Sequence, residues 1–136
     1  MTPTLTALVG FALWTILLTV MIGVTRAYVA KATGRKPNSF TPSAEDIGGF
    51  SQRLARAHAN CCENLPVAAA ILLAVQVSGL QTISDPLAPW ILAARVVQSG
   101  IHLASTSVAA VYARFAFYLV QIILLLVIAL RALAAG

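Results

Sequence analysis

Long uninterrupted runs of apolar residues are the feature that most constrains this chain. No charged residue occurs between Leu5 and Thr25, and nearly every residue from Phe115 to Leu130 is apolar. A run of about 20 apolar residues can cross the hydrocarbon core of a bilayer as a helix. Only 10% of the 136 residues are charged, whereas soluble domains typically carry about a quarter. The chain lacks the charges for a fully hydrated surface, and we predict an integral membrane protein.

Helix-breaking residues divide the chain into four expected membrane spans. The spans cover about residues 5–30, 48–78, 86–106 and 108–133, and a polar segment, residues 31–47, joins the first two. Within that segment, Ser43 is followed by Glu45 and Asp46, a pattern that predicts a helix start with Ser43 as N-cap. Short later connections favour antiparallel neighbours. The expected fold is all-α, a four-helix transmembrane bundle.

A secretory signal peptide is the competing interpretation of the first apolar run. This run contains no Lys or Arg before Arg26, so the basic region that precedes the apolar part of a signal peptide is missing. The run is also longer than the apolar part of a typical signal peptide. We therefore interpret it as a retained first span.

The distribution of basic residues predicts the orientation in the membrane. Most of them lie around the first and third connections: Arg26, Lys31, Arg35, Lys36, Arg53, Arg56 and Arg114. Under the positive-inside rule these connections are cytoplasmic and both termini lie on the other side. This topology accounts for the net charge of +5. Because no nucleic-acid-binding motif is present, we expect no nucleic-acid partner.

Polar residues inside the spans form three helical stripes. Such residues usually face the bundle interior or an aqueous cavity. The stripes comprise Arg53, Arg56, Asn60, Glu63 and Asn64 on the second helix, Arg95, Gln98, His102 and Ser105 on the third, and Arg114, Tyr118 and Gln121 on the fourth. Together they predict a polar cavity near the cytoplasmic face.

The charges in these stripes indicate an anionic ligand. Four arginines accompany a single acid, Glu63, and guanidinium groups present paired donors that suit carboxylates. Glu63 could hold an ammonium group of the same ligand. A purely structural alternative remains open, in which Glu63 pairs with an arginine between helices and Arg114 anchors the chain at the interface. We interpret His58, which points away from the stripe, as a packing or capping residue.

The adjacent residues Cys61 and Cys62 predict neither a disulfide nor a metal site. Neighbouring cysteines seldom reach unstrained disulfide geometry. No further Cys or His lies at the spacing of a zinc site.

The residues from Arg53 to Pro66, RLARAHANCCENLP, closely resemble the signature of the MAPEG family, the membrane-associated proteins of eicosanoid and glutathione metabolism. That signature reads approximately RxxRAHxNxxENxP. The chain length, the four expected spans, the long first connection and the segment from Arg114 to Tyr118 also match the family. The resemblance therefore covers nearly the whole chain.

The resemblance implies a homotrimer that binds glutathione between neighbouring protomers near the cytoplasmic face. It further implies that Arg56, Asn60 and Glu63 hold the tripeptide, that Arg114 stabilises the glutathione thiolate, and that Tyr118 contacts the ligand. The stripes and the resemblance together give the candidate binding residues Arg53, Arg56, Asn60, Glu63, Asn64, Arg95, Gln98, His102 and Tyr118, with Arg114 as the catalytic candidate. Membrane lipids and a hydrophobic small-molecule substrate are the other expected partners.

Departures from the family pattern narrow the expected activity. Some eicosanoid-synthesising members carry an additional basic residue where this chain has Ala59, and an aromatic residue where it has Asn64. The segment Phe115-Ala116-Phe117 also lacks a serine that one prostaglandin-forming branch has there. The chain is more similar to the broad bacterial-type branch, which implies a bacterial inner membrane. The expected function is a glutathione-dependent transferase or peroxidase acting on hydrophobic electrophiles. The alternative is a non-catalytic trimer that binds lipid or an acidic metabolite. A transporter or channel subunit is disfavoured because no span is broken at mid-membrane.

Overall fold

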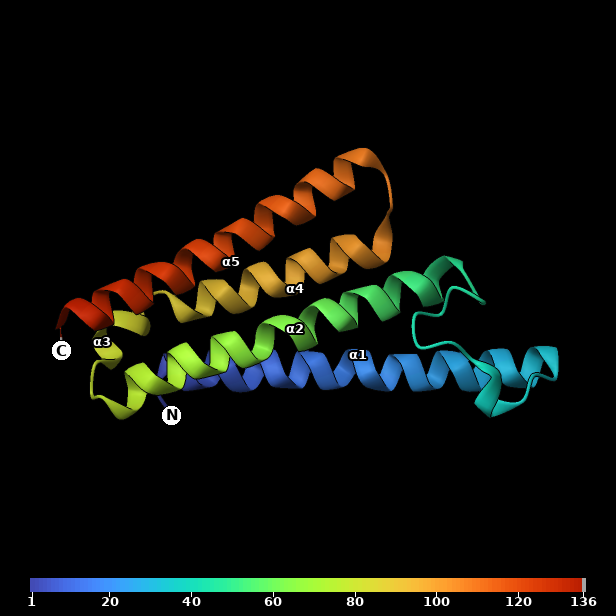
Figure 1. Ribbon diagram of the computed structural model, residues 1–136, viewed down its shortest axis with the longest axis horizontal. Helices are drawn as coiled ribbons and strands as arrows, with labels where there is room; N and C mark the ends of the chain where they lie inside the picture. Colours follow the sequence, from blue (N-terminus) through green and yellow to red (C-terminus); the bar gives the residue numbers. More distant parts are fainter. Residues whose placement is uncertain (136) are drawn as a thin grey trace.

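The computed structural model describes residues 1–135, and every regular element in them is helical. Four long helices lie side by side (Figure 1). They are α1 (Pro3–Thr33), α2 (Gly49–Val77), α4 (Ala88–Ala104) and α5 (Val108–Ala135), and two short helices, η1 (Pro37–Ser39) and α3 (Gln81–Ser84), lie in the connections. The start of α1 and the end of α5 lie at the same end of the molecule as α3, and segments 34–48 and 105–107 lie at the opposite end (Figure 1).

Three of the long helices, α1, α2 and α5, are long and apolar enough to cross a membrane. The expected fourth span corresponds to α4, which has 17 residues and is therefore about 25 Å long. That length is at the lower limit for crossing the hydrocarbon core. The predicted all-helical architecture is confirmed, and three of the four predicted spans correspond to helices that are long and apolar enough to cross a membrane.

Local chemistry explains where the long helices begin and end. The hydroxyl of Thr2 accepts a hydrogen bond from the amide of Leu5, and Pro3 occupies the first turn of α1. Gly34 ends α1 in the left-handed conformation, at φ 70°. The hydroxyl of Ser107 accepts a hydrogen bond from the amide of Ala110 at the start of α5.

The second long helix begins at Gly49 and not near Ser43, so the predicted N-cap is wrong. Ala44 adopts a left-handed conformation, at φ 56°, which interrupts any helix there. Asp46 accepts hydrogen bonds from the amide and hydroxyl of Thr41 and forms an ion pair of 2.5 Å with Arg35. Asp46 thus stabilises a loop rather than a first helical turn.

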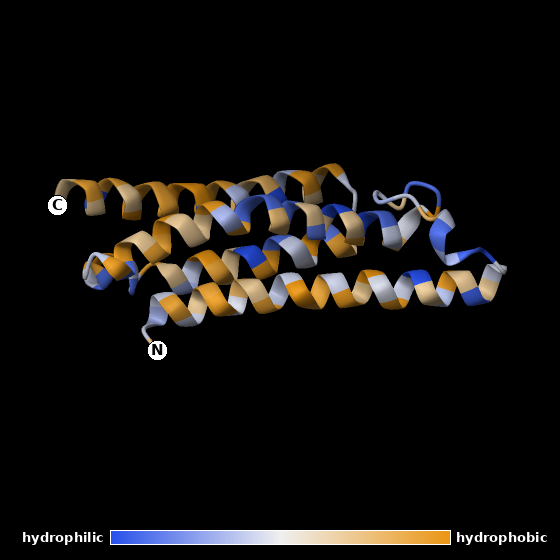
Figure 2. Ribbon diagram, turned by 60° about the horizontal axis from the view of Figure 1, so that its bottom comes forward, coloured by the Kyte–Doolittle hydropathy of each residue, from blue (hydrophilic) through white to orange (hydrophobic). Residues whose placement is uncertain are grey.

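The apolar core lies between α1, α2 and α4 and also includes Leu125 and Ile128 of α5, which packs mainly against α4. Its fully enclosed side chains include Leu18, Leu54, Cys61, Ala68, Ala88 and Ile128. Gly10 allows close packing of α1 on α4, because a Cβ atom there would lie 2.6 Å from Cδ2 of Leu92. Hydrophilic residues concentrate on the parts of α2 and α4 nearer segment 34–48, whereas the half nearer the chain ends is mostly apolar (Figure 2). The candidate site is therefore expected in the half of the molecule nearer segment 34–48.

Candidate functional site

A cleft of about 320 Å³ lies between α4 and α5 in the more polar half of the molecule, with one residue of α2 in its wall. Its lining residues are Asn60, Gln98, His102, Val111, Arg114, Phe115 and Tyr118. Five of the ten predicted site residues therefore come together in one cleft. They are contributed by all three predicted stripes.

Asn60 is the point at which the stripes of α2 and α4 meet. Its side-chain oxygen, Oδ1, accepts hydrogen bonds from Nη1 of Arg95 and, at 3.3 Å, from Nε2 of Gln98. Gln98 also accepts a hydrogen bond of 2.8 Å from Nε2 of Gln121 on α5. Side-chain amides thus connect three helices beneath the cleft.

Arg95 lies behind Asn60 and does not line the cleft. It is only 1% exposed, and its guanidinium lies 5.1 Å from the centre of the Phe11 ring. No described acidic side chain forms an ion pair with it. Within the chain its guanidinium contacts Asn60 and the face of Phe11, a cation–π arrangement, and its buried Nε has no acceptor among the described residues.

Arg114 lies half-buried in the wall of the cleft. Its Nε atom is buried, and no described residue accepts a hydrogen bond from it. Buried donors in proteins almost always have an acceptor, because an unpaired one is costly. Tyr118, one turn further along α5, lines the same cleft. A guanidinium in this setting is suited to an anion that enters the cleft from outside the chain.

Arg53 and Asn64 make contacts within the protein instead of lining the cleft. Nε of Arg53 donates a 2.8 Å hydrogen bond to the carbonyl of Leu103 in the last turn of α4. Nδ2 of Asn64 donates a 2.7 Å hydrogen bond to the backbone carbonyl of Asn60. Arg53 thereby satisfies one of the carbonyls that a helix end leaves unpaired.

Arg56 and Glu63 lie exposed on the outer side of α2, outside the cleft. The pairing of Glu63 with an arginine of its own chain, which the sequence left open, does not occur among the described residues, where the ion pair is Arg35–Asp46. The chain therefore presents two separate groups of polar residues: those of the cleft, and the pair on the outer face of α2.

A sequence model of the MAPEG family matches residues 4–134. The chain belongs to the MAPEG family. Neither a curated protein nor a solved structure matched the chain. The match covers all four long helices except one terminal residue each of α1 and α5, and it includes the whole Arg53–Pro66 motif, so the family resemblance inferred from that motif is confirmed. Together with the apolar helices, it identifies an integral membrane protein.

Other polar residues of this MAPEG chain have structural contacts. Nε2 of His58 lies 2.8 Å from the hydroxyl of Thr19 on α1, consistent with the packing role predicted for it. Sγ of Cys61 lies 3.7 Å from the hydroxyl of Ser99, and both cysteines are free thiols. These groups link helices to one another and lie outside the cleft.

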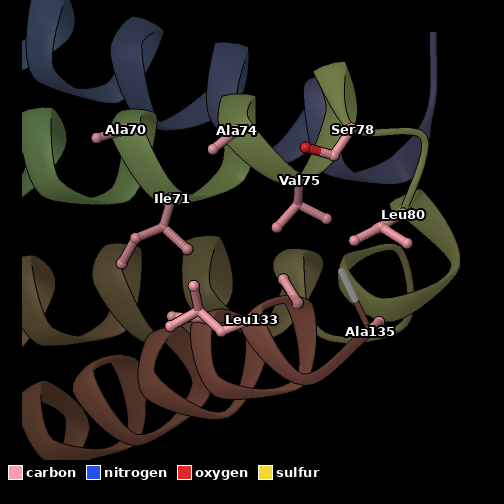
Figure 3. A pocket seen from close by; sticks show the side chains of 10 residues that line it. Ala70, Ile71, Ala74, Val75, Ser78, Leu80, Leu133 and Ala135 are labelled. Carbon is pink, nitrogen blue, oxygen red and sulfur yellow. The ribbon is translucent and has the colours of Figure 1, made fainter.

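A second and larger cavity, of about 520 Å³, lies between α2 and α5 at the end that holds the chain termini. Its lining is almost wholly apolar, with Ile71, Val75, Leu80 and Leu133 around small alanine side chains (Figure 3). None of the predicted site residues lines it. It therefore lacks the charged groups that recognition of a polar, anionic ligand requires.

Gln121 was placed on the α5 stripe from the sequence but was not proposed as a site residue. In the structure it is 2% exposed and donates hydrogen bonds to Gln98 and to the carbonyl of Phe117, while its buried Oε1 accepts none from the described residues. A glutamine within the otherwise apolar stretch from Phe115 to Leu130 is the signal that could have identified it, since polar groups at this depth need partners.

Proposed function

We propose that this MAPEG protein is a membrane-bound, glutathione-dependent transferase or peroxidase that acts on hydrophobic electrophiles. The observation that carries the proposal is the position of Arg114 in the cleft wall, where its buried Nε has no acceptor among the described residues of its own chain. The departures from the eicosanoid-forming pattern favour a bacterial-type member of the family, located in a bacterial inner membrane.

The proposed role of Arg114 is to stabilise the glutathione thiolate. A thiol is a weak nucleophile until it ionises, and a guanidinium beside the sulfur favours the charged form by direct attraction. The thiolate then attacks an electrophilic carbon, a C–S bond forms, and the leaving group departs with its electron pair. With an organic hydroperoxide the sulfur attacks oxygen instead, and a second glutathione completes a disulfide as the alcohol and water are released.

The polar residues around Arg114 suit the rest of the tripeptide. Glutathione carries two carboxylates and an ammonium group. The NH₂ group of Asn60 and the guanidinium of Arg56 are donors for carboxylates, and Glu63 is an acceptor for the ammonium. Val111 and Phe115 form apolar parts of the cleft wall, where a hydrophobic electrophile can reach the sulfur from the membrane.

The separation of Arg56 and Glu63 from the cleft of their own chain supports a homotrimer with a shared site. Arg56 and Glu63 lie on the exposed face of α2, away from the cleft of their own chain. An exposed carboxylate at this depth of a membrane span is costly unless protein covers it. In the proposed assembly four helices per protomer cross the membrane, with α4 as the fourth span, and α2 of one protomer lies against the cleft of the next.

Glutathione binding to the purified protein in mild detergent tests the proposal. Calorimetry should give a saturable binding isotherm, and ultraviolet absorbance should show the thiolate of the bound tripeptide at neutral pH. Conjugation of a chloronitrobenzene and reduction of an organic hydroperoxide then separate transferase from peroxidase. Binding without a thiolate signal would favour the non-catalytic alternative, and absence of binding would refute the proposed function.

The proposed orientation places segment 34–48 in the cytoplasm and both termini on the opposite side. A cysteine introduced at Asn38, in a chain whose native cysteines are replaced by alanine, should react with a membrane-impermeant reagent only in inside-out vesicles. Reaction in right-side-out vesicles would reverse the topology and place the cleft on the other face.

A further inference from the structure

The hydrogen bonds beneath the cleft form a continuous chain through three helices. Gln121 on α5 donates through Nε2 to the carbonyl of Phe117, at 2.9 Å, and to Oε1 of Gln98, at 2.8 Å. Gln98 on α4 donates through Nε2 to Oδ1 of Asn60, and Arg95 donates to the same oxygen. The Phe117 carbonyl stands at one end of this chain and the Arg95 guanidinium at the other.

The direction of every amide in this chain follows from its two ends. The oxygen and nitrogen of an amide side chain have nearly the same shape, so hydrogen-bond partners decide which atom lies where. A backbone carbonyl only accepts, so Gln121 must present its NH₂ group to Phe117. A guanidinium only donates, so Asn60 must present its oxygen to Arg95. In one orientation of its amide, Gln98 accepts the hydrogen bond from Gln121 and donates one to Asn60. A single arrangement of the three amides therefore meets the requirements of both the Phe117 carbonyl and the Arg95 guanidinium.

This arrangement leaves one donor unused. With Oδ1 of Asn60 held inward by two donors, the NH₂ group is on the other side of the planar amide. Asn60 lines the cleft, and no described residue accepts a hydrogen bond from its Nδ2. An amide donor at the wall of a cleft that also contains Arg114 is suited to a carboxylate oxygen.

We propose that Gln121 is a positioning residue that acts through Gln98 to hold Asn60 with its oxygen inward and its NH₂ group toward the cleft, where it donates to a ligand carboxylate. The identity of that ligand as glutathione rests on the proposed function. The orientation of Asn60 does not, because it follows from contacts within the protein.

The substitution Asn60→Asp removes the NH₂ donor that points to the cleft but keeps the inward oxygen to which Arg95 and Gln98 donate. Aspartate keeps the inward oxygen that Arg95 and Gln98 require and adds an ion pair with Arg95, so the thermal unfolding temperature should rise by at least about 2 °C. It also replaces the outward donor with a second oxygen that repels a carboxylate. Glutathione affinity should therefore fall about ten-fold or more.

Gln121→Leu tests whether the effect is transmitted through Asn60. Alone, it should weaken glutathione binding by about three- to ten-fold, since Gln98 loses the partner that fixes its own amide and Asn60 is then held by Arg95 alone. In the Asn60→Asp background it should cause no further loss, because the donor it positions is already absent. The matched control is Gln76→Leu, which removes a hydrogen-bonded glutamine at the other end of the molecule and should lower stability without changing affinity.

Four outcomes decide the proposal. It is supported by a more stable, weakly binding Asn60→Asp protein whose affinity is insensitive to Gln121→Leu. It is overturned if Asn60→Asp binds glutathione as the unmodified chain does, if that variant is less stable, or if the losses from the two substitutions simply add. Should the unmodified chain not bind glutathione, the proposed function fails. The rise or fall in the unfolding temperature of Asn60→Asp would then still confirm or refute the orientation of Asn60.

Discussion

The two ends of the molecule differ in whether their polar side chains have hydrogen-bond partners within the chain. At the end that holds the termini, the hydroxyl of Thr4 lies 2.6 Å from Oδ1 of Asp85 and 2.8 Å from the hydroxyl of Ser84. Thr2 and Gln76 are likewise paired, at 2.9 Å. At the cleft end, Nε of Arg114 is buried without an acceptor, and Nδ2 of Asn60 has no partner among the described residues.

The difference separates polar groups whose partners lie within the chain from the groups that we propose to bind a ligand. Polar groups at membrane depth require partners, because no water is available in the hydrocarbon core. Where the chain itself supplies every partner, as around Thr4, the cluster ties α1 to α3 and the end of α2. Arg114 differs in that it combines a donor without an acceptor with a place in the cleft wall, where an incoming anion can reach its guanidinium. Among the described residues, Arg26, Arg95 and Trp14 also have a buried donor without an acceptor but do not line the cleft. Substitutions at the two ends should therefore affect different measurements.

The largest effect is expected from Arg114→Ala. Loss of the guanidinium beside the sulfur should raise the pKa of the bound thiol by about one to three units. The conjugation rate at neutral pH should then fall about ten-fold or more, with a smaller change in glutathione affinity. Rapid-mixing absorbance of the thiolate across a pH series measures both quantities.

Arg131→Ala is the matched control, because Arg131 lies exposed near the other end of the same helix. Its conjugation rate should equal that of the unmodified chain. If Arg114→Ala forms a stable protein with unchanged thiol pKa and turnover, the thiolate role is wrong.

The next effect concerns the exposed pair on α2. Glu63→Gln should weaken glutathione binding by about ten-fold, since one charged contact with the ligand ammonium is lost. If the site is shared, co-expressing Glu63→Gln with Arg114→Ala chains should restore part of the activity, because mixed assemblies contain some sites with both native residues. Glu45→Gln, in the exposed loop, is the control and should bind glutathione normally. A purely additive loss in the mixture would place both residues in one protomer's site.

The sequence predicted the long helices well because their signals are local. Apolar runs and helix breakers depend only on neighbouring residues, and the observed helices follow them closely. The four-residue helix α3 had no such signal. The N-cap predicted at Ser43 is wrong because Asp46 accepts a hydrogen bond from Thr41 and forms an ion pair with Arg35, contacts that stabilise a loop instead of a helical turn. Non-local hydrogen bonds therefore decided where α2 begins.

The candidate site was predictable in its composition but not in its geometry. Helical periodicity placed Asn60, Gln98 and Arg114 in the same half of the molecule, and the cleft contains all three. Periodicity alone could not reveal that Arg95 lies behind Asn60, although it is one turn from Gln98 on the same stripe. That distinction depends on how α1 and α2 pack against α4, and therefore on contacts far apart in the sequence.

The closed cluster at the other end should affect stability alone. Thr4→Val removes the hydroxyl that Asp85 and Ser84 contact, leaving a partly buried carboxylate with fewer donors. The free energy of unfolding should fall by about 1–3 kcal/mol, and the unfolding temperature should drop accordingly. Glutathione affinity should remain unchanged. Thr6→Val is the control, because that hydroxyl is exposed and contacts only the carbonyl of Thr2. A change in affinity with Thr4→Val would mean that the two ends are coupled.

The smallest effect is expected in the loop beside the cleft end, where Asp46 forms a closed cluster of its own. The hydroxyl of Thr41, with the Arg35 guanidinium, lowers the pKa of Asp46 from 3.8 to about 2. Because the folded loop favours the carboxylate, its stabilisation is complete above about pH 4 and is lost as the pH falls toward 2.

Asp46→Asn should therefore increase hydrogen exchange in residues 34–48 at neutral pH. The difference from the unmodified chain should shrink as the pH approaches 2. Ser43→Ala, at the position where no helix begins, should leave exchange unchanged at every pH. Equal exchange in Asp46→Asn and the unmodified chain at pH 7 would show that this cluster does not order the loop.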